Sequence, residues 1–332
     1  MTAAVPVVDL EEWQAAPAEG RARIASDLDQ ALRDSGMFLL KGHGVPREAT
    51  DEFRYWAKKF FALPREVKSA YSTEAVYDSG WLEMHPPGGV GVPTTDGVEA
   101  PDSPDLHESF YVSPTHRTGR PDLDRIYYPA NRWPRELPAF RRAAEAYTTH
   151  MVRLAHDINE MFAAVLGLPE DYFTSLARQA TWTQNASWYP SLNTVGEVAS
   201  GQLRNGPHTD LGTFTVLNRQ LGVGGLQGWN ETDGWFAPPY DADAFVVNIG
   251  DLMELWTDGR WRALRHRVLA PSTSAPDEEL LSLVFFFETD PETWVEPMAA
   301  PVGGGRGLAP VRSRRSILEK LGVSFDPARS TA

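Results

Sequence analysis

Two histidines and one aspartate in this chain could hold a metal ion. Of the eight histidines, only His208 is followed two residues later by a carboxylate, that of Asp210. Residues i and i+2 of a β-strand point to the same face, so this imidazole and this carboxylate can share one ion. His266 opens an apolar strand later in the chain and is the best third ligand. Two histidines and one carboxylate around a metal with open positions are typical of non-haem Fe(II) oxygenases.

The spacing alone leaves a second interpretation open. The chain contains 45 acidic residues, so a histidine and an acid two positions apart also arise by chance. On that interpretation, His208 caps a turn and His266 is a surface histidine with satisfied hydrogen bonds.

Composition excludes several classes of protein. The chain has 332 residues, of which 42% are hydrophobic and 23% charged, as in a soluble globular protein with a large core. It has no cysteine, which excludes disulfides, thiolate nucleophiles and cysteine zinc sites. The net charge of −14 argues against nucleic acid as a partner. No signal peptide or membrane span is apparent, and we expect a cytoplasmic enzyme.

Helices dominate the first half of the predicted structure. Apolar spacing predicts a helix over Ala22–Ser35, followed by a buried strand at Met37–Leu40, and Pro46 opens a further helix. Residues 85–104 are rich in proline and glycine and are predicted to be a surface loop or a lid. A long supporting helix is predicted over Trp133–Leu166.

Short strands separated by turn residues dominate the second half. They are predicted at Thr181–Tyr189, Thr213–Arg219, Gly225–Gly228, Gly234–Ala237, Ala244–Ile249, Arg265–Ala270 and Leu280–Glu288. Helices followed by strands indicate an α+β protein with a double-stranded β-helix, or jelly roll, at its core. We divide the chain into an N-terminal region (1–116), a helical support (117–178), the jelly roll (179–300) and a C-terminal tail with a helix (301–332).

Several motifs in the same order resemble one known family. They are VPVVDL (5–10), GMFLLKGHGVP (36–46), FFALP (60–64), NASWYP (185–190), GQLRNGPHTDLGTFTVL (201–217), GGLQ (224–227), FVVNIGDL (245–252) and RWRALRHRV (260–268). Together they resemble the isopenicillin N synthase-like branch of the Fe(II)/2-oxoglutarate-dependent oxygenases, over roughly residues 5–290. The resemblance implies a jelly roll whose His208, Asp210 and His266 hold iron, with 2-oxoglutarate and O2 as cosubstrates.

One position departs from the family pattern. Family members that use 2-oxoglutarate have an arginine, followed two residues later by a serine, on the strand after the second histidine. Here Ser282 is present, but the arginine position is occupied by Leu280. A buried carboxylate without a partner is costly, and a guanidinium pairs with it through two charge-assisted bonds. Glu278 and Glu279 would worsen binding if they pointed inward.

Three explanations for Leu280 stay open. Arg219, on the strand face expected to point inward, could bind the distal carboxylate, unless it lies beyond the strand end in solvent. The enzyme could instead work without the cosubstrate, as isopenicillin N synthase does. A different keto acid, or a substrate with its own carboxylate, is the third explanation.

Other residues are assigned by their place in the family pattern. Tyr189 and Ser282 stand where the family contacts a carboxylate, although Tyr189 could simply pack in the core. Arg204 is interpreted as structural. Four aromatic residues could line the pocket, although aromatic residues more often belong to the core: Trp81, Trp182, Trp188 and Phe214.

The leading hypothesis is a 2-oxoglutarate-dependent oxygenase that hydroxylates, desaturates or cyclises a small molecule. A cosubstrate-independent Fe(II) oxidase is the alternative, and a silent binding protein or sensor is a third. The substrate and the oligomeric state do not follow from the sequence.

Overall fold

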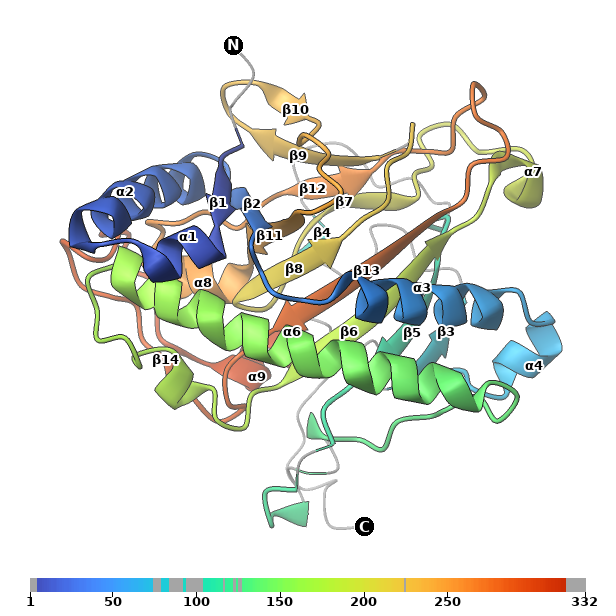
Figure 1. Ribbon diagram of the computed structural model, residues 1–332, viewed down its shortest axis with the longest axis horizontal. Helices are drawn as coiled ribbons and strands as arrows, with labels where there is room; N and C mark the ends of the chain where they lie inside the picture. Colours follow the sequence, from blue (N-terminus) through green and yellow to red (C-terminus); the bar gives the residue numbers. More distant parts are fainter. Residues whose placement is uncertain are drawn as a thin grey trace.

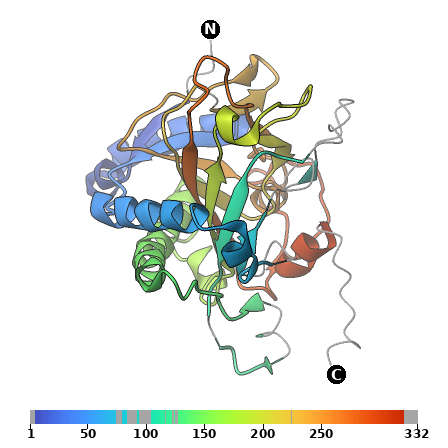
Figure 2. The same cartoon turned by 90° about the vertical axis from the view of Figure 1, so that its right-hand side faces the viewer.

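A computed structural model describes residues 5–73, 79–83, 92–93, 104–115, 117–121, 124, 127–223 and 225–320. Two sheets face each other, and the helices α3 (Arg47–Phe61) and α6 (Pro138–Val165) lie side by side along the larger one (Figures 1 and 2). Within the described part of the chain, no helix combines the length and the apolar character that crossing a bilayer requires. The predicted segment 85–104 lies outside the described residues, apart from residues 92, 93 and 104.

The larger sheet has eight strands in the order β1-β2-β11-β8-β13-β6-β5-β3. Their bounds are β1 Val7–Asp9, β2 Met37–Lys41, β3 Gly80–Leu82, β5 Glu108–Val112, β6 Trp182–Tyr189, β8 Phe214–Asn218, β11 Phe245–Ile249 and β13 Leu280–Phe287. The smaller sheet has the order β10-β9-β12-β7-β4. Its strands are β4 Val92–Pro93, β7 Asn205–Thr209, β9 Leu226–Asn230, β10 Gly234–Phe236 and β12 His266–Val268.

The remaining elements surround these sheets. They are α1 Leu10–Ala15, α2 Ala18–Asp34, α4 Arg65–Ser69, the 3₁₀ turn η1 Thr174–Leu176, α7 Leu192–Val195, α8 Asp251–Trp256, the strand pair β14 Trp294–Val295 and β15 Val311–Arg312, and α9 Ser313–Lys320.

One hydrophobic core joins the helical half to the large sheet. Along α6, apolar residues recur at three- and four-residue spacing, and the buried ones include Phe140, Tyr147 and Phe162. Phe162 makes edge-to-face contacts with Phe214 of β8 and with Trp261. The large sheet is therefore covered by helices on one face, which leaves its other face to the small sheet.

Gly36 allows the N-terminal region to pack closely against the segment that leads into β12, the strand of His266. It ends α2 with a φ of 71°, a left-handed conformation that favours glycine. A Cβ atom at this position would lie 2.1 Å from the carbonyl oxygen of Arg262, which precedes β12. Only glycine therefore allows this close approach of the two backbones.

The predicted fold class is confirmed: this is an α+β protein with a jelly-roll core and a long supporting helix. The predicted strands occur with ends shifted by one or two residues. The long helix starts at Pro138 rather than Trp133, because residues 133–137 include Pro134 and form a turn. The prediction missed the strands β1, β3, β4, β5, β14 and β15. The four-part division of the chain stays a prediction.

Candidate metal centre and cofactor pocket

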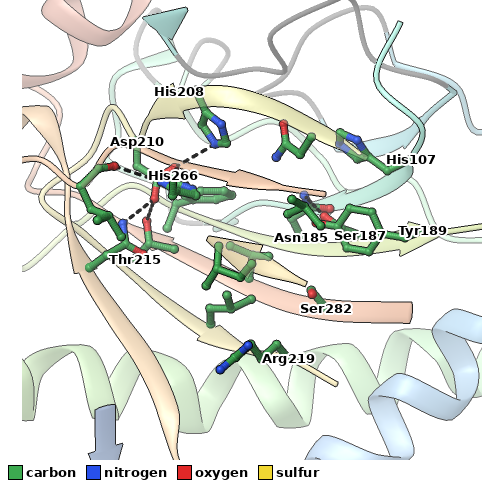
Figure 3. Close-up of a pocket in the computed structure, with 18 of the residues that line it drawn as sticks. His107, Asn185, Ser187, Tyr189, His208, Asp210, Thr215, Arg219, His266 and Ser282 are labelled. Atoms are coloured by element: carbon green, nitrogen blue, oxygen red, sulfur yellow. Dashed lines mark hydrogen bonds and ion pairs between the residues drawn. The ribbon is translucent and has the colours of Figure 1, made fainter. Parts of the chain in front are cut away.

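The three predicted ligands come together in the small sheet. His208 of β7 is directly paired in register with His266 of β12, and their ring centroids are 4.2 Å apart. Asp210 follows β7, and its Oδ1 lies 3.7 Å from Nε2 of His208 and 3.8 Å from Nε2 of His266. One ligand atom from each residue lies within 4.8 Å of the others. A single ion can bridge these separations (Figure 3).

The large sheet holds the other oxygen of Asp210. Its Oδ2 accepts hydrogen bonds from Thr215 Oγ1 of β8 at 2.6 Å and from Asn248 Nδ2 of β11 at 2.8 Å. All three residues are buried. The carboxylate therefore presents only Oδ1 to the two imidazoles.

Both imidazoles are oriented by backbone carbonyl groups. Nδ1 of His208 lies 2.8 Å from the carbonyl oxygen of Gly206, and Nδ1 of His266 lies 3.0 Å from that of Leu264. A carbonyl only accepts, so each Nδ1 carries a proton, and each Nε2 faces Asp210 as the ring nitrogen left for a metal ion. This is the tautomer that a metal ion needs.

Burial and neighbouring charges set the protonation of the ligands. Burial, followed by the nearby His266, lowers the pKa of His208 to about 4. Burial pushes the pKa of Asp210 upward, but the two imidazoles and the Thr215 and Asn248 hydrogen bonds outweigh it, so the net shift is downward. At neutral pH the site therefore offers a neutral imidazole at His208 and a carboxylate at Asp210.

The ligands lie at one side of a cavity of about 110 Å³ between the two sheets. Alternate residues of β6 point into it: Thr183, Asn185, Ser187 and Tyr189. From β13 the lining residues are Leu280, Ser282, Val284 and Phe286. The strand period of two therefore places a predominantly polar row beside a predominantly apolar row.

Tyr189 and Ser282 lie in this cavity, where they were predicted. Tyr189 is register-paired with Leu280, and Ser282 with Ser187. Burial raises the pKa of Tyr189 to about 12, so its phenol stays protonated and can donate a hydrogen bond. Tyr189 also packs in a small cluster with Val268 and Leu280, so both interpretations of this residue describe part of its environment.

Arg219 also lines the cavity, on the far side from His208 (Figure 3). It follows β8 directly, and its Nη2 donates to the carbonyl oxygens of Pro238 at 2.8 Å and Pro239 at 2.6 Å. Its guanidinium carbon is 5.5 Å from the centre of the Tyr240 ring. Among the described residues that line the cavity, Arg219 is the one lysine or arginine.

Glu278, which could have disfavoured an anion, is paired with Arg204 and does not line the cavity. Nη1 of Arg204 donates to Oε1 of Glu278 at 3.0 Å, and the arginine side chain is fully buried. Oε2 of Glu278 accepts from the backbone N–H of Val223. The charge of Glu278 is thus compensated locally, and Arg204 has a structural role.

None of the four aromatic residues predicted to line the pocket does so; the alternative, that they belong to the core, is correct. Trp182 and Trp188 alternate with the cavity-facing residues of β6, so they point to the opposite, helix-covered face. Trp188 stacks on Phe61 of α3, and Trp81 donates to Glu108 at 2.7 Å. Phe214 packs against α6 in the core.

Sequence reasoning missed other cavity residues, including His107, Asn185 and Asn205. Nδ1 of His107 lies 2.7 Å from the carbonyl oxygen of Arg204, and burial lowers its pKa to about 4, so this ring is neutral. Little in the sequence indicated His107, because it directly precedes β5, a strand that was not predicted. The alternation along β6 could have revealed Asn185.

Fold and site together define a non-haem iron enzyme. Two imidazoles and one carboxylate, each oriented by a hydrogen bond on its other side, are a donor set that would hold Fe(II). Bound iron would supply the redox chemistry with O2, while the protein would supply the ligands and the cavity in which substrates are oriented.

Comparisons with known proteins agree with this class. The family model named for the N-terminal region of the non-haem dioxygenase in morphine synthesis matches residues 5–136. The family model of the 2OG-Fe(II) oxygenase superfamily matches residues 188–289. Validamycin A dioxygenase of Streptomyces hygroscopicus subsp. limoneus is 54% identical over 321 residues, which cover 96% of this chain and 86% of that protein. A homoarginine-6-hydroxylase of Glycine max is 29% identical over 307 residues, covering 89% and 88%.

A crystal structure of a full-length Neurospora crassa protein in complex with alpha-KG has the same fold, with a TM-score of 0.81, 20% identity and 96% of both chains covered. The chain belongs to the 2OG-Fe(II) oxygenase superfamily, in its isopenicillin N synthase-like branch. It is an Fe(II)- and 2-oxoglutarate-dependent dioxygenase that acts on a small molecule.

Proposed function

We propose that this enzyme oxidises validamycin A or a close chemical relative of it. The observation that carries the proposal is the 54% identity to validamycin A dioxygenase across 96% of the chain. The cavity is compatible with such a role, because hydroxyl, amide and imidazole groups line it next to the iron ligands. Hydrogen-bonding groups in a mostly uncharged pocket suit a small polar molecule.

The proposal includes a binding site for the distal carboxylate of 2-oxoglutarate at Arg219. The ladder between β13 and β8 ends with Leu283 opposite Asn218, so continuing the register brings Ser282 opposite Arg219. Both residues line the cavity. Arg219 is thus a diagonal neighbour of Leu280, the position from which the family arginine would reach the same cosubstrate.

The contacts of Arg219 support this assignment. The carbonyl oxygens of Pro238 and Pro239 orient its Nη2 without neutralising its charge. No acidic side chain among the described residues forms an ion pair with it. An unneutralised guanidinium at the edge of the cavity suits a carboxylate, with the hydroxyls of Tyr189 and Ser282 as further donors.

We also propose that the enzyme works in the cytoplasm without a nucleic-acid partner. The net charge of −14 and the lack of cysteine support this proposal. Cell fractionation would test the location, and a gel-shift titration with DNA and RNA would test the partner.

Turnover of validamycin A tests the main proposal. The purified enzyme is supplied with Fe(II), 2-oxoglutarate, O2 and validamycin A, and substrate, product and succinate are measured together. We expect one succinate for each molecule of validamycin A consumed, and no turnover by His208→Ala. The mass of the product separates hydroxylation from desaturation. Absence of turnover by an iron-loaded enzyme would refute the proposed substrate, and turnover without succinate would refute the role of the cosubstrate.

A further inference from the structure

Two buried carbonyl oxygens in the cavity have no hydrogen-bond partner among the described residues. They are Oδ1 of Asn185 and Oδ1 of Asn205. Both side chains line the cavity that holds the iron ligands. A buried polar atom left unpaired costs free energy, so such atoms in a functional cavity point to a ligand that pairs with them.

The surroundings of Asn185 explain why its oxygen is unpaired. Its Nδ2 donates to Ser187 Oγ at 2.8 Å, one step along the same face of β6. Its register partners on the two neighbouring strands are Val284 of β13 and Tyr111 of β5. Figure 3 shows Asn185 beside Ser187 and Tyr189, apart from the iron ligands. The amide is therefore held by its nitrogen end, while its oxygen is left for another donor.

Asn205 belongs to the opposite sheet. It opens β7, three residues before His208, and is register-paired with the apolar Val268 of β12. Asn185 is 5% exposed, and the Oδ1 atom of Asn205 is buried as well. Each sheet thus contributes one unpaired acceptor, so a molecule between the sheets can meet both.

We propose that Asn185 and Asn205 form an acceptor pair that binds hydrogen-bond donors of the substrate. The matching groups are hydroxyls or a protonated amine, because amide oxygens accept and do not donate. A carboxylate or phosphate would meet only acceptors at these two atoms. Among the described residues that line the cavity, Arg219 is the one with a cationic lysine or arginine side chain. The pair therefore selects a neutral or cationic molecule rich in donors, and this inference rests on the proposed function.

Kinetics with validamycin A as the probe test the pair. Asn185→Ala and Asn205→Ala are made singly and together in the full-length, iron-loaded enzyme. The same substitution at Asn193, an exposed residue of α7 bonded to Asp277, is the matched control. We expect the KM for validamycin A to rise about tenfold in each single variant and about a hundredfold in the double variant. The KM for 2-oxoglutarate and the iron content should not change.

Stability separates a binding role from a structural role. Removing an unpaired acceptor should leave the unfolding temperature of the substrate-free protein unchanged or higher, whereas a structural role predicts a lower one. If an alanine variant fails to fold, Asn185→Ser or Asn205→Ser replaces it. Serine removes the amide oxygen but keeps a shorter polar side chain. Wild-type turnover with an unchanged KM in the variants would overturn this inference alone. Lack of wild-type turnover would overturn the proposed function and this inference with it.

Discussion

Asn248 donates a hydrogen bond of 2.8 Å from its Nδ2 to Oδ2 of Asp210, the carboxylate oxygen that faces away from the two histidines. The donor belongs to β11 of the large sheet, and the acceptor follows β7 of the small sheet. The iron ligand is thus fixed from across the sandwich. The N-terminal half shares in this arrangement, since β11 is also paired with β2.

Loss of this hydrogen bond should weaken iron binding. Asn248→Ala leaves Oδ2 of Asp210 with only the Thr215 hydroxyl, so the carboxylate is less well oriented. We expect iron affinity to fall about 10- to 100-fold, as for partners of other metal ligands. Anaerobic titration with Fe(II) measures the change. Thr215→Val should give a similar loss, and wild-type affinity in both variants would contradict this role.

Arg219→Ala should specifically weaken binding of 2-oxoglutarate. A carboxylate deprived of its guanidinium partner in a desolvated site loses several kcal/mol, so we expect the KM for 2-oxoglutarate to rise about 100-fold. The KM for validamycin A should change little. Arg219→Lys keeps the charge without the planar guanidinium, so its KM for 2-oxoglutarate should lie between those of the wild type and Arg219→Ala.

Leu280→Arg provides a rescue of that variant. In the Arg219→Ala background it places a guanidinium on the neighbouring strand, diagonal to the missing one. We expect the KM for 2-oxoglutarate to return toward the wild-type value. A KM for 2-oxoglutarate that stays at the wild-type value in Arg219→Ala would argue that the cosubstrate binds elsewhere.

Acidification should destabilise the metal-free protein through His107. Burial lowers the pKa of this histidine from 6.5 to about 4, so the unfolded chain takes up the proton first as the pH falls. Its contribution is fully present above pH 6.5 and is lost progressively toward pH 4, by up to about 3 kcal/mol. Urea unfolding of wild type and His107→Gln across this range should show a shallower decline in the variant. The same substitution at His150 on α6 is the control, and equal slopes in all three would contradict the assignment.

The buried ion pair between Lys68 and Glu108 should stabilise the region around β5. Nζ of Lys68 lies 2.6 Å from Oε2 of Glu108, and both side chains are largely buried. Lys68→Met leaves Glu108 with the Trp81 N–H as its donor, and we expect a loss of about 3 kcal/mol in the free energy of unfolding. The double variant Lys68→Met/Glu108→Gln should lose less, because no charge then stays unpaired. A double variant at least as unstable as the single one would refute this explanation.

The sequence by itself determined the fold class and the metal ligands. The His208-Thr209-Asp210 spacing specifies one shared face on any strand, and the ordered motifs around it identify the family. The strand pattern after Thr181 follows from turn residues between apolar runs. These are local properties of the chain, so they can be read without knowing which strands pair.

Only the tertiary structure decided which side chains meet in the cavity. The pairing of His266 with His208, the hydrogen bond from Asn248 to Asp210 and the position of Arg219 near Ser282 all depend on the register between strands distant in sequence. The orientation of Trp182 and Trp188 illustrates the same point. The alternation of side chains along β6 is a local property, but which of its two faces packs against the helices depends on the rest of the chain. A shift of one residue in register exchanges the two faces of a strand, and packing of the whole chain selects between them.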